Sequence, residues 1–201
     1  MYLMLQNRLR TPVTRLITPI CAGLLRMGLS ANAVTVLGAF GTTVIALSLF
    51  PSGHLFLGTI FITIFVLSDL LDGTMARISG SSSSKWGAFL DSTLDRVSDA
   101  AILIGLWFYF RDSGGYEAPL LIINLVLGGL IPYIRARAEA LSIKCDVGFA
   151  ERVERLIFIL VGAGFYGIGV EIAMISALVA LTILSAITVM QRIRVVYKLG
   201  R

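Results

Sequence analysis

Six long apolar stretches limit what this chain of 201 residues can fold into. A membrane-spanning helix needs about 20 predominantly apolar residues, and each stretch comes close to that length. Hydrophobic residues make up 57% of the chain and charged residues only 14%, too few to cover a soluble domain of this size. The expected spans are residues 32–50, 54–77, 86–110, 118–138, 153–170 and 171–191. The sequence therefore predicts an all-α integral membrane protein with six transmembrane helices.

The first 28 residues differ from these stretches because arginines interrupt their apolar residues, at Arg8, Arg10, Arg15 and Arg26. This pattern predicts an amphipathic helix that lies in the headgroup plane. A cleaved signal peptide would instead need an unbroken apolar core and a small-residue cleavage site. The spans use most of the remaining residues. We therefore expect one domain over 1–201, with an interfacial helix at 1–28 and a six-helix bundle at 29–201.

Lysine and arginine gather at one end of the six-span arrangement, and Arg111 is the clear exception. Because positive residues favour the cytoplasmic side, we expect a multi-pass protein of the cell membrane with both termini in the cytoplasm. The formal net charge of +5 then describes a one-sided basic surface. Such a surface suits anionic lipid headgroups or an anionic substrate better than nucleic acid.

Two pairs of aspartates interrupt the second and third apolar stretches, at Asp69 and Asp72 and at Asp91 and Asp95. Spacings of three and four residues place each pair on one face of its helix. The two helices are joined by a short polar segment, so we expect them to be antiparallel neighbours with the carboxylates at one depth near the cytoplasmic surface. Charged groups inside a membrane are costly, and four carboxylates repel one another unless cations lie between them.

Carboxylates without neighbouring histidine or cysteine are typical ligands of Mg²⁺ or Mn²⁺. Four of them can hold two ions, an arrangement that recurs in phosphoryl chemistry. The expected ligands are Asp69, Asp72, Asp91 and Asp95, with two Mg²⁺ as the cofactor and Mn²⁺ as the alternative. Gly73 and Ala76 leave room for a ligand against the helix. Arg77 offers a charged guanidinium group that can bind phosphate through paired hydrogen bonds. The structural alternative is that the aspartates pair with arginines and only hold helices together.

The whole motif reads Asp69-x2-Asp72-Gly73-x2-Ala76-Arg77-x9-Gly87-x3-Asp91-x3-Asp95 and resembles the signature of the CDP-alcohol phosphotransferase family. That signature usually has eight residues between its arginine and second glycine. This chain has nine, in a serine-rich loop where an extra residue is not expected to move the carboxylates. The family transfers a substituted phosphate from a CDP-linked donor to an alcohol and releases CMP. The resemblance thus implies a transferase of phospholipid biosynthesis that uses CDP-diacylglycerol, and family precedent suggests a homodimer.

The resemblance also implies individual roles. Asp69, Asp72 and Asp91 are expected to hold one metal ion and Asp69, Asp91 and Asp95 the second. Asp95 is expected to be the general base that takes the proton of the acceptor hydroxyl. The expected donor contacts are Asn32, Thr35, Gly73, Ala76, Arg77 and one loop serine, Ser83. Two alternatives stay open here, since Asn32 can simply cap the first span and the serine run can be a flexible linker.

Basic residues near the cytoplasmic ends of the last three spans indicate the acceptor. The candidate phosphate site consists of Arg137, Lys144, Arg152, Arg155 and Arg192. A cluster of arginines suits a phosphorylated alcohol, which a neutral alcohol would not need. The pattern Ala136-Arg137-Ala138-Glu139, followed by Glu151-Arg152, resembles family members that join inositol phosphate to CDP-diacylglycerol. We therefore expect inositol phosphate as the acceptor.

Two other functions could use the same residues. A phosphatidylglycerophosphate synthase would use glycerol 3-phosphate, which is also anionic. A cation transporter would use the carboxylates as an ion path, and transporters usually place such groups near the midplane on broken helices. The acids here lie toward one surface, and the second span has no proline or glycine break before Asp69. Both observations favour the enzyme.

Overall fold

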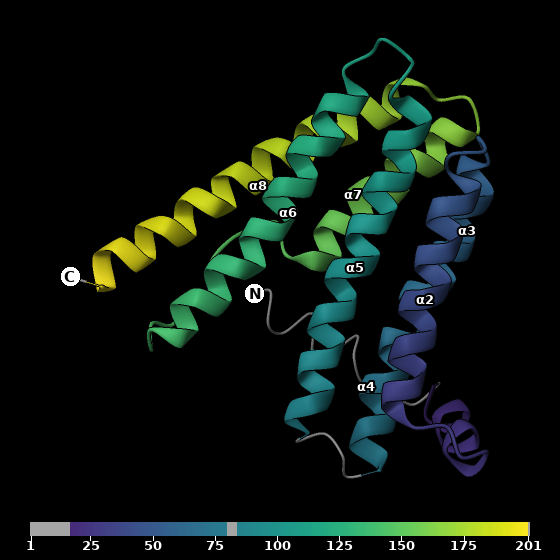
Figure 1. Ribbon diagram of the computed structural model, residues 1–201, viewed down its shortest axis with the longest axis vertical. Coiled ribbons are helices and arrows are strands. Elements are labelled where there is room, and N and C mark those ends of the chain that lie inside the picture. Colours follow the sequence, from purple (N-terminus) through teal and green to yellow (C-terminus); the bar gives the residue numbers. More distant parts are fainter. Residues whose placement is uncertain (1–16, 80–83, 201) are drawn as a thin grey trace. The chain divides into compact units, whose positions relative to one another are not determined.

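The computed structural model describes residues 17–79 and 84–200, with the backbone alone for Asp69 and Leu70. Every regular element in these ranges is a helix, and none is a strand (Figure 1). The helices are α2 (Ala31–Leu49), α3 (Leu55–Val66), α4 (Asp69–Ile78), α5 (Lys85–Phe110), α6 (Glu117–Ala140), α7 (Arg152–Gly167) and α8 (Ile172–Leu199). A shorter apolar helix, Ile17–Arg26, precedes them. Each of the six expected stretches is therefore helical, and the all-α prediction is confirmed.

Four helical segments are long and apolar enough to cross a membrane: Ala31–Leu49, Leu55–Ile78, Glu117–Ala140 and Ile172–Leu199. Helix α5 has 26 residues but carries Asp95, Arg96 and Asp99 within its length, and α7 has only 16 residues. The expected interfacial helix over residues 1–28 falls partly outside the described residues. Its described part, Ile17–Arg26, is helical.

The second expected span is found as one helical stretch, Leu55–Ile78, with a turn inside it. Helix α3 ends at Val66, and α4 begins at Asp69 after a turn at Leu67 and Ser68. The Ser68 hydroxyl donates a hydrogen bond to the carbonyl of Phe65 at 2.6 Å. It also lies so close to Gly38 of α2 that a Cβ at Gly38 would collide with it. A serine that bonds to its own backbone can interrupt a helix without any proline or glycine.

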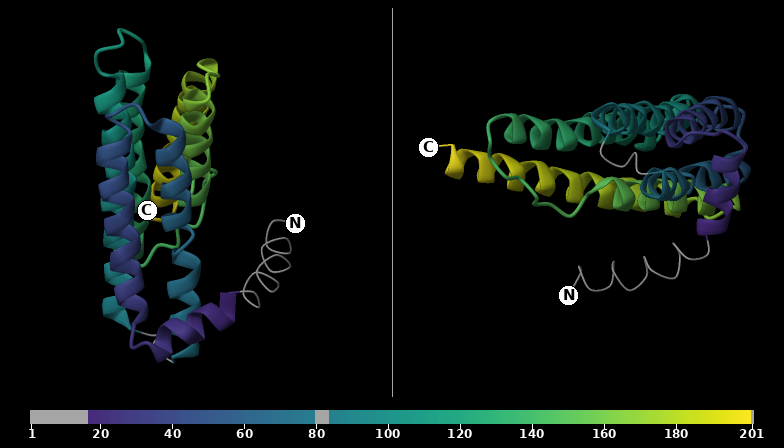
Figure 2. Two further views of the ribbon diagram at one scale, coloured as in Figure 1. Left: turned by 90° about the vertical axis from the view of Figure 1, so that its right-hand side faces the viewer. Right: turned by 90° about the horizontal axis from the view of Figure 1, so that it is seen from below.

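The chain forms two compact units. The first comprises residues 1–44 and 62–98, and the second comprises residues 45–61 and 99–201. In the first unit, Cys21, Val34 and Met75 form a buried apolar cluster that joins the helix Ile17–Arg26 to α2 and α4. Figure 2 shows this short helix running across the direction of α2 and α4. The ends of α2 and α4 are thus packed together by apolar contacts.

In the second unit, α8 packs against α6 and α7 (Figure 2). The buried amide of Asn124 on α6 donates to the Leu178 carbonyl at 3.3 Å and to the Thr182 hydroxyl at 2.8 Å. A second close contact joins α5 to the end of α2, where Gly105 faces the carbonyl of Ala46 and leaves no room for a Cβ. Small and polar residues at such contacts are typical of helices that pack inside membranes.

Candidate active site

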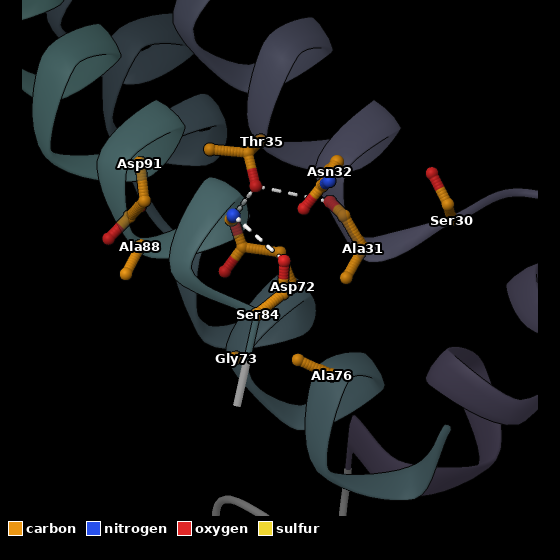
Figure 3. A pocket seen from close by; sticks show the side chains of 11 residues that line it. Ser30, Ala31, Asn32, Thr35, Asp72, Gly73, Ala76, Ser84, Ala88 and Asp91 are labelled. Carbon is orange, nitrogen blue, oxygen red and sulfur yellow. Dashed lines mark hydrogen bonds between the residues drawn. The ribbon is translucent and has the colours of Figure 1, made fainter. Parts of the chain in front are cut away.

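A pocket of about 290 Å³ opens in the first unit between the beginning of α2, the first turns of α4 and the beginning of α5 (Figure 3). Its size is at the lower end of the range for small-molecule sites. Its lining residues are Ser30, Ala31, Asn32, Thr35, Asp72, Gly73, Ala76, Ser84, Gly87, Ala88 and Asp91. Segments that lie far apart in the sequence therefore meet around one cavity that contains two of the four expected metal ligands.

Asp72 is the more enclosed of the two pocket carboxylates. Its residue is only 7% exposed, and Oδ2 accepts a hydrogen bond of 2.6 Å from the hydroxyl of Thr35. An ionised group so far from water needs hydrogen-bond donors or a cation close by. Asp72 is therefore a carboxylate whose position is fixed on one side by α2 and which faces the cavity as part of its wall.

Asp91 lines the same pocket from α5, so the structure brings Asp72 and Asp91 together. Asp95 lies one helical turn further along α5, outside the set of lining residues, and 3.5 Å from Arg96 Nη2. Asp69 is the first residue of α4, and its side chain lies outside the described residues. Among the described side chains, no group of three histidines, cysteines or acids is close enough to hold a metal ion. The four-aspartate site thus stays a prediction.

The chemistry of the pocket suits a hard divalent cation. Asp72 and Asp91 supply carboxylate oxygens, and Asn32 and the pocket serines add neutral oxygens, while no histidine or cysteine lines the cavity. Oxygen ligands of this kind are those that Mg²⁺ and Mn²⁺ bind in proteins. The donor set that the structure describes is therefore compatible with either ion.

Four of the six residues expected to contact the donor line the pocket: Asn32, Thr35, Gly73 and Ala76. The fifth, Arg77, is exposed and bonds back to its own helix, with Nε 3.0 Å from the Gly73 carbonyl and Nη2 3.1 Å from the Thr74 hydroxyl. The sixth, Ser83, lies outside the described residues.

Ser84 lines the pocket, although the sequence interpretation favoured its neighbour Ser83. The Ser84 hydroxyl accepts a hydrogen bond from the backbone N–H of Gly87 at 3.2 Å, just where α5 begins. This is the N-cap arrangement, in which a serine satisfies a free amide in the first helical turn. Ser84 lies three residues before the motif glycine Gly87, and this spacing could have identified Ser84 from the sequence.

The predicted acceptor residues belong to the second unit, and two of them share a carboxylate. Arg152 Nε lies 3.2 Å and Arg155 Nη2 lies 3.0 Å from the two oxygens of Asp99. Arg155 also donates to the Ala150 carbonyl at 3.2 Å and is 5% exposed. The carboxylate of Asp99 thus ties the side chains of Arg152 and Arg155 to α5.

Arg192 is almost completely enclosed, at 1% exposure. Its guanidinium donates to the carbonyls of Val147 at 2.8 Å and Ile131 at 2.7 Å and forms an ion pair with Glu151. Lys144 is exposed and lies 3.5 Å from Asp146, and Arg137 is exposed on α6. The predicted phosphate site therefore contains two buried, well-bonded arginines, the half-buried Arg152 and two basic residues open to solvent.

Cys21 lies beside α4, where its thiol donates to the Leu71 carbonyl at 3.5 Å. Burial raises the pKa of the Cys21 thiol above its ordinary value, an effect that a backbone hydrogen bond and the charge of Arg77 only partly oppose. A thiol with a raised pKa contains little of the nucleophilic thiolate. The Cys21 side chain therefore serves mainly to pack the helix Ile17–Arg26 against α2 and α4.

Apolar helices of spanning length, together with a ligand-sized pocket that contains two carboxylates, define a helical membrane protein with an acidic site. The model of the family described as CDP-alcohol phosphatidyltransferase matches residues 28–191. The chain belongs to this family, and the resemblance expected from the motif is confirmed. Membership makes the protein a transferase.

Two relatives show how closely the chain follows one branch of the family. The phosphatidylinositol phosphate synthase of Streptomyces avermitilis is 42% identical over 199 residues, covering 94% of this chain and 81% of the relative. The synthase of the same name from Mycobacterium tuberculosis (strain ATCC 25618 / H37Rv) is 44% identical over 195 residues, covering 94% of this chain and 88% of the relative. The similarity extends over nearly the whole length of each chain.

Solved structures agree with the sequence comparison. The crystal structure of the Mycobacterium tuberculosis phosphatidylinositol phosphate synthase with CDP-DAG bound matches with a TM-score of 0.85 and 42% identity, covering 91% of this chain and 94% of that chain. The structure of that synthase in complex with manganese and citrate also matches with a TM-score of 0.85 and 42% identity, covering 90% of this chain and 88% of that chain.

Proposed function

We propose that this protein transfers the phosphatidyl group of CDP-diacylglycerol to a hydroxyl of inositol phosphate, forming phosphatidylinositol phosphate and releasing CMP. The observation that carries the proposal is the near-full-length similarity to phosphatidylinositol phosphate synthases, one of which has been solved with CDP-DAG bound. The pocket lined by Asp72 and Asp91 supports it independently, because its oxygen ligands suit the divalent ion that phosphoryl transfer uses.

The proposed metal ligands are Asp69, Asp72, Asp91 and Asp95. Asp72 and Asp91 already share a pocket, and the position of Asp69 three residues before Asp72 returns it to the same helical face. When bound, two Mg²⁺ or Mn²⁺ ions neutralise phosphate oxygens and stabilise the charge on the leaving CMP. The manganese complex of the Mycobacterium tuberculosis synthase supports a divalent ion.

Asp95 is the proposed general base. It follows Asp91 by one turn of α5, and its side chain is 16% exposed, so it remains accessible to a small acceptor. Its carboxylate takes the proton of the acceptor hydroxyl as that oxygen bonds to the phosphorus of the phosphatidyl group. The bond from this phosphorus to the CMP oxygen breaks, and CMP leaves with the bonding electrons. An aspartate of ordinary basicity can do this only while the new bond forms, since the free hydroxyl is far less acidic.

The donor is proposed to occupy the pocket of the first unit. Asn32 and the short side chains of Gly73 and Ala76 line it, and no atom lies within 4 Å of the position that a Cβ of Gly73 would take. Thr35, Arg77 and Ser83 complete the proposed set. A ligand can therefore approach the backbone of α4 closely at Gly73.

The acceptor phosphate is proposed to bind Arg137, Lys144, Arg152, Arg155 and Arg192. Arg152 and Arg155 are held by Asp99, which follows Asp95 by one turn of α5. A phosphate monoester carries close to two negative charges at neutral pH, and guanidinium groups bind it through paired hydrogen bonds.

The proposed arrangement in the membrane has six spans and an N-terminal interfacial helix in one domain, with both termini and the active site cytoplasmic. Three helices, α2, α3 and α5, continue from one compact unit into the other, which supports a single domain. The one-sided distribution of lysine and arginine supports the orientation. Small residues on the helices support a homodimer.

The test is release of CMP from CDP-diacylglycerol by the purified protein with one acceptor at a time: inositol phosphate, free inositol or glycerol 3-phosphate. We expect release with inositol phosphate, its loss on chelation and its return with Mg²⁺ or Mn²⁺. Asp91→Asn should abolish release, while Asp112→Asn, in an exposed turn, should leave it unchanged. Preference for glycerol 3-phosphate would establish the alternative synthase. Metal-independent inactivity with every acceptor, together with cation flux in liposomes, would establish a transporter.

A further inference from the structure

We propose that Thr35 is a positioning residue for Asp72, whose carboxylate it fixes at the pocket wall so that the metal-binding geometry exists before substrate arrives. This inference rests on the proposed function, in which Asp72 is a metal ligand. It gives Thr35 a role beyond the proposed donor contact, because the hydroxyl donates to a protein carboxylate.

The contact has the features of a strong hydrogen bond. Thr35 Oγ1 and Asp72 Oδ2 are 2.6 Å apart, within the range of charge-assisted O–H···O⁻ bonds. Thr35 is 8% exposed and Asp72 is 7% exposed, so water competes little for either group. Both residues line the cavity, and the bond therefore lies directly beside the place where a cation would bind (Figure 3).

The threonine is a rigid donor. Its hydroxyl also lies 3.1 Å from the carbonyl of Ala31, four residues earlier in α2. Threonine in a helix takes the side-chain rotamers that allow this approach, and it has only one side-chain torsion between the backbone and the oxygen. The hydroxyl has a single hydrogen, which goes to the charged and closer acceptor, Asp72. Thr35 thus points one fixed donor at one carboxylate oxygen.

The helices that carry the two residues are packed together at the same level. Val34, next to Thr35, forms a buried cluster with Met75 of α4 and with Cys21. The Cys21 thiol donates to the carbonyl of Leu71, the residue before Asp72. Apolar packing therefore sets the spacing of α2 and α4, and the Thr35 hydroxyl sets the orientation of the carboxylate within that spacing. Hydrogen bonds of this kind to metal ligands commonly change metal affinity by about 10- to 100-fold.

The test measures Mn²⁺ binding in the absence of substrate, from the electron paramagnetic resonance signal of free Mn²⁺ in detergent. Thr35→Val removes the hydroxyl at nearly constant shape, and Thr35→Ser keeps it. Thr42→Val is the matched control, since Thr42 is a buried threonine of α2 outside the pocket. We expect Thr35→Val to weaken Mn²⁺ binding roughly tenfold, Thr35→Ser to stay within about threefold of the natural protein, and Thr42→Val to bind normally. If Thr35→Val does not yield folded protein, Thr35→Ala repeats the measurement.

The outcomes separate the inference from the proposed function. Normal Mn²⁺ binding by Thr35→Val, with the natural protein also binding, overturns the positioning role alone. Normal Mn²⁺ binding together with a loss of CDP-diacylglycerol affinity assigns Thr35 to the donor instead and likewise overturns the inference. Absence of Mn²⁺ binding in the natural protein removes the metal site of the proposed function. A tenfold loss in Thr35→Val that Thr35→Ser restores supports the inference.

Discussion

The carboxylate of Asp99 accepts a hydrogen bond of 3.0 Å from Arg155 Nη2 and thereby joins α5 to α7. Their side chains are 17% and 6% exposed. A partner removed from such a pair leaves a charge in a poorly hydrated place. The positions of the Arg152 and Arg155 side chains, and their affinity for a phosphate, should therefore depend on Asp99 as much as on the arginines themselves.

Asp99→Asn should lower the stability of the protein in detergent by about 2 kcal/mol, because the buried Arg155 keeps its charge but loses its ion pair with the Asp99 carboxylate. It should also raise the KM for inositol phosphate, since the carboxylate that fixes the Arg152 and Arg155 side chains is lost. Thermal melts and acceptor titrations measure these effects. The control is Asp112→Asn, which removes the exposed ion pair with Arg111 and should cost less than about 0.5 kcal/mol. Equal effects of the two substitutions would contradict the prediction.

Arg192→Lys should destabilise the protein strongly, by about 3 kcal/mol, although it keeps the positive charge. The buried guanidinium donates hydrogen bonds in three directions, to Val147, Ile131 and Glu151. The single ammonium group of a lysine cannot reproduce that planar arrangement of donors. Thermal melts should show the loss. Arg194→Lys, on the exposed neighbour two residues later, is the control and should leave the melting temperature unchanged. A melting temperature of Arg192→Lys equal to that of the control would show that stability does not depend on the guanidinium hydrogen bonds.

Gly105→Ala should destabilise the second unit because the new Cβ collides with the backbone carbonyl of Ala46, which cannot move aside as a side chain can. We expect a loss of about 2 kcal/mol, as in other overpacked contacts. Gly129→Ala is the matched control, since it also lies within a helix and its Cβ meets no atom within 4 Å. There the change should stabilise the helix by up to about 1 kcal/mol. Melting curves of the two variants should therefore shift in opposite directions.

Gly73→Ala should leave stability nearly unchanged and raise the KM for CDP-diacylglycerol several-fold. No atom lies within 4 Å of the new methyl group, so the fold tolerates it, but Gly73 lines the pocket and the methyl group occupies donor space. Donor titrations at saturating acceptor check this. Gly23→Ala, which also has nothing within 4 Å and lies outside the pocket, should not change the donor KM. An unchanged donor KM in Gly73→Ala would place the donor elsewhere.

The helices could be predicted from the apolar stretches, because hydrophobicity over 20 residues is a strong signal. The turn at Leu67 and Ser68, which separates α3 from α4, could not be predicted from that signal. No proline or glycine marks it. The Ser68 hydroxyl bonds to the Phe65 carbonyl there and lies close to Gly38, which is 30 residues away in the chain. Helix α8 also continues to Leu199, beyond the end of the expected span 171–191.

The pocket itself could be predicted better than its internal bonding. The motif gave Asp72, Gly73, Ala76 and Asp91, all of which line the cavity. The partners of the basic residues depend on tertiary contacts and were not visible in the sequence. Arg192 meets Glu151, and Arg155 meets Asp99 from 56 residues away. Sequence patterns identify which charges are present, whereas only the fold decides which of them neutralise one another.

The turn at Leu67 and Ser68 does not expose the backbone amide of Asp72. Ser68 keeps helical backbone angles, and its carbonyl accepts the backbone N–H groups of Leu71 and Asp72. A backbone amide that is already bonded has no hydrogen left for a carboxylate or a phosphate. The ionised form of Asp72 therefore depends on side-chain donors such as Thr35, or on a cation, in surroundings that disfavour charge.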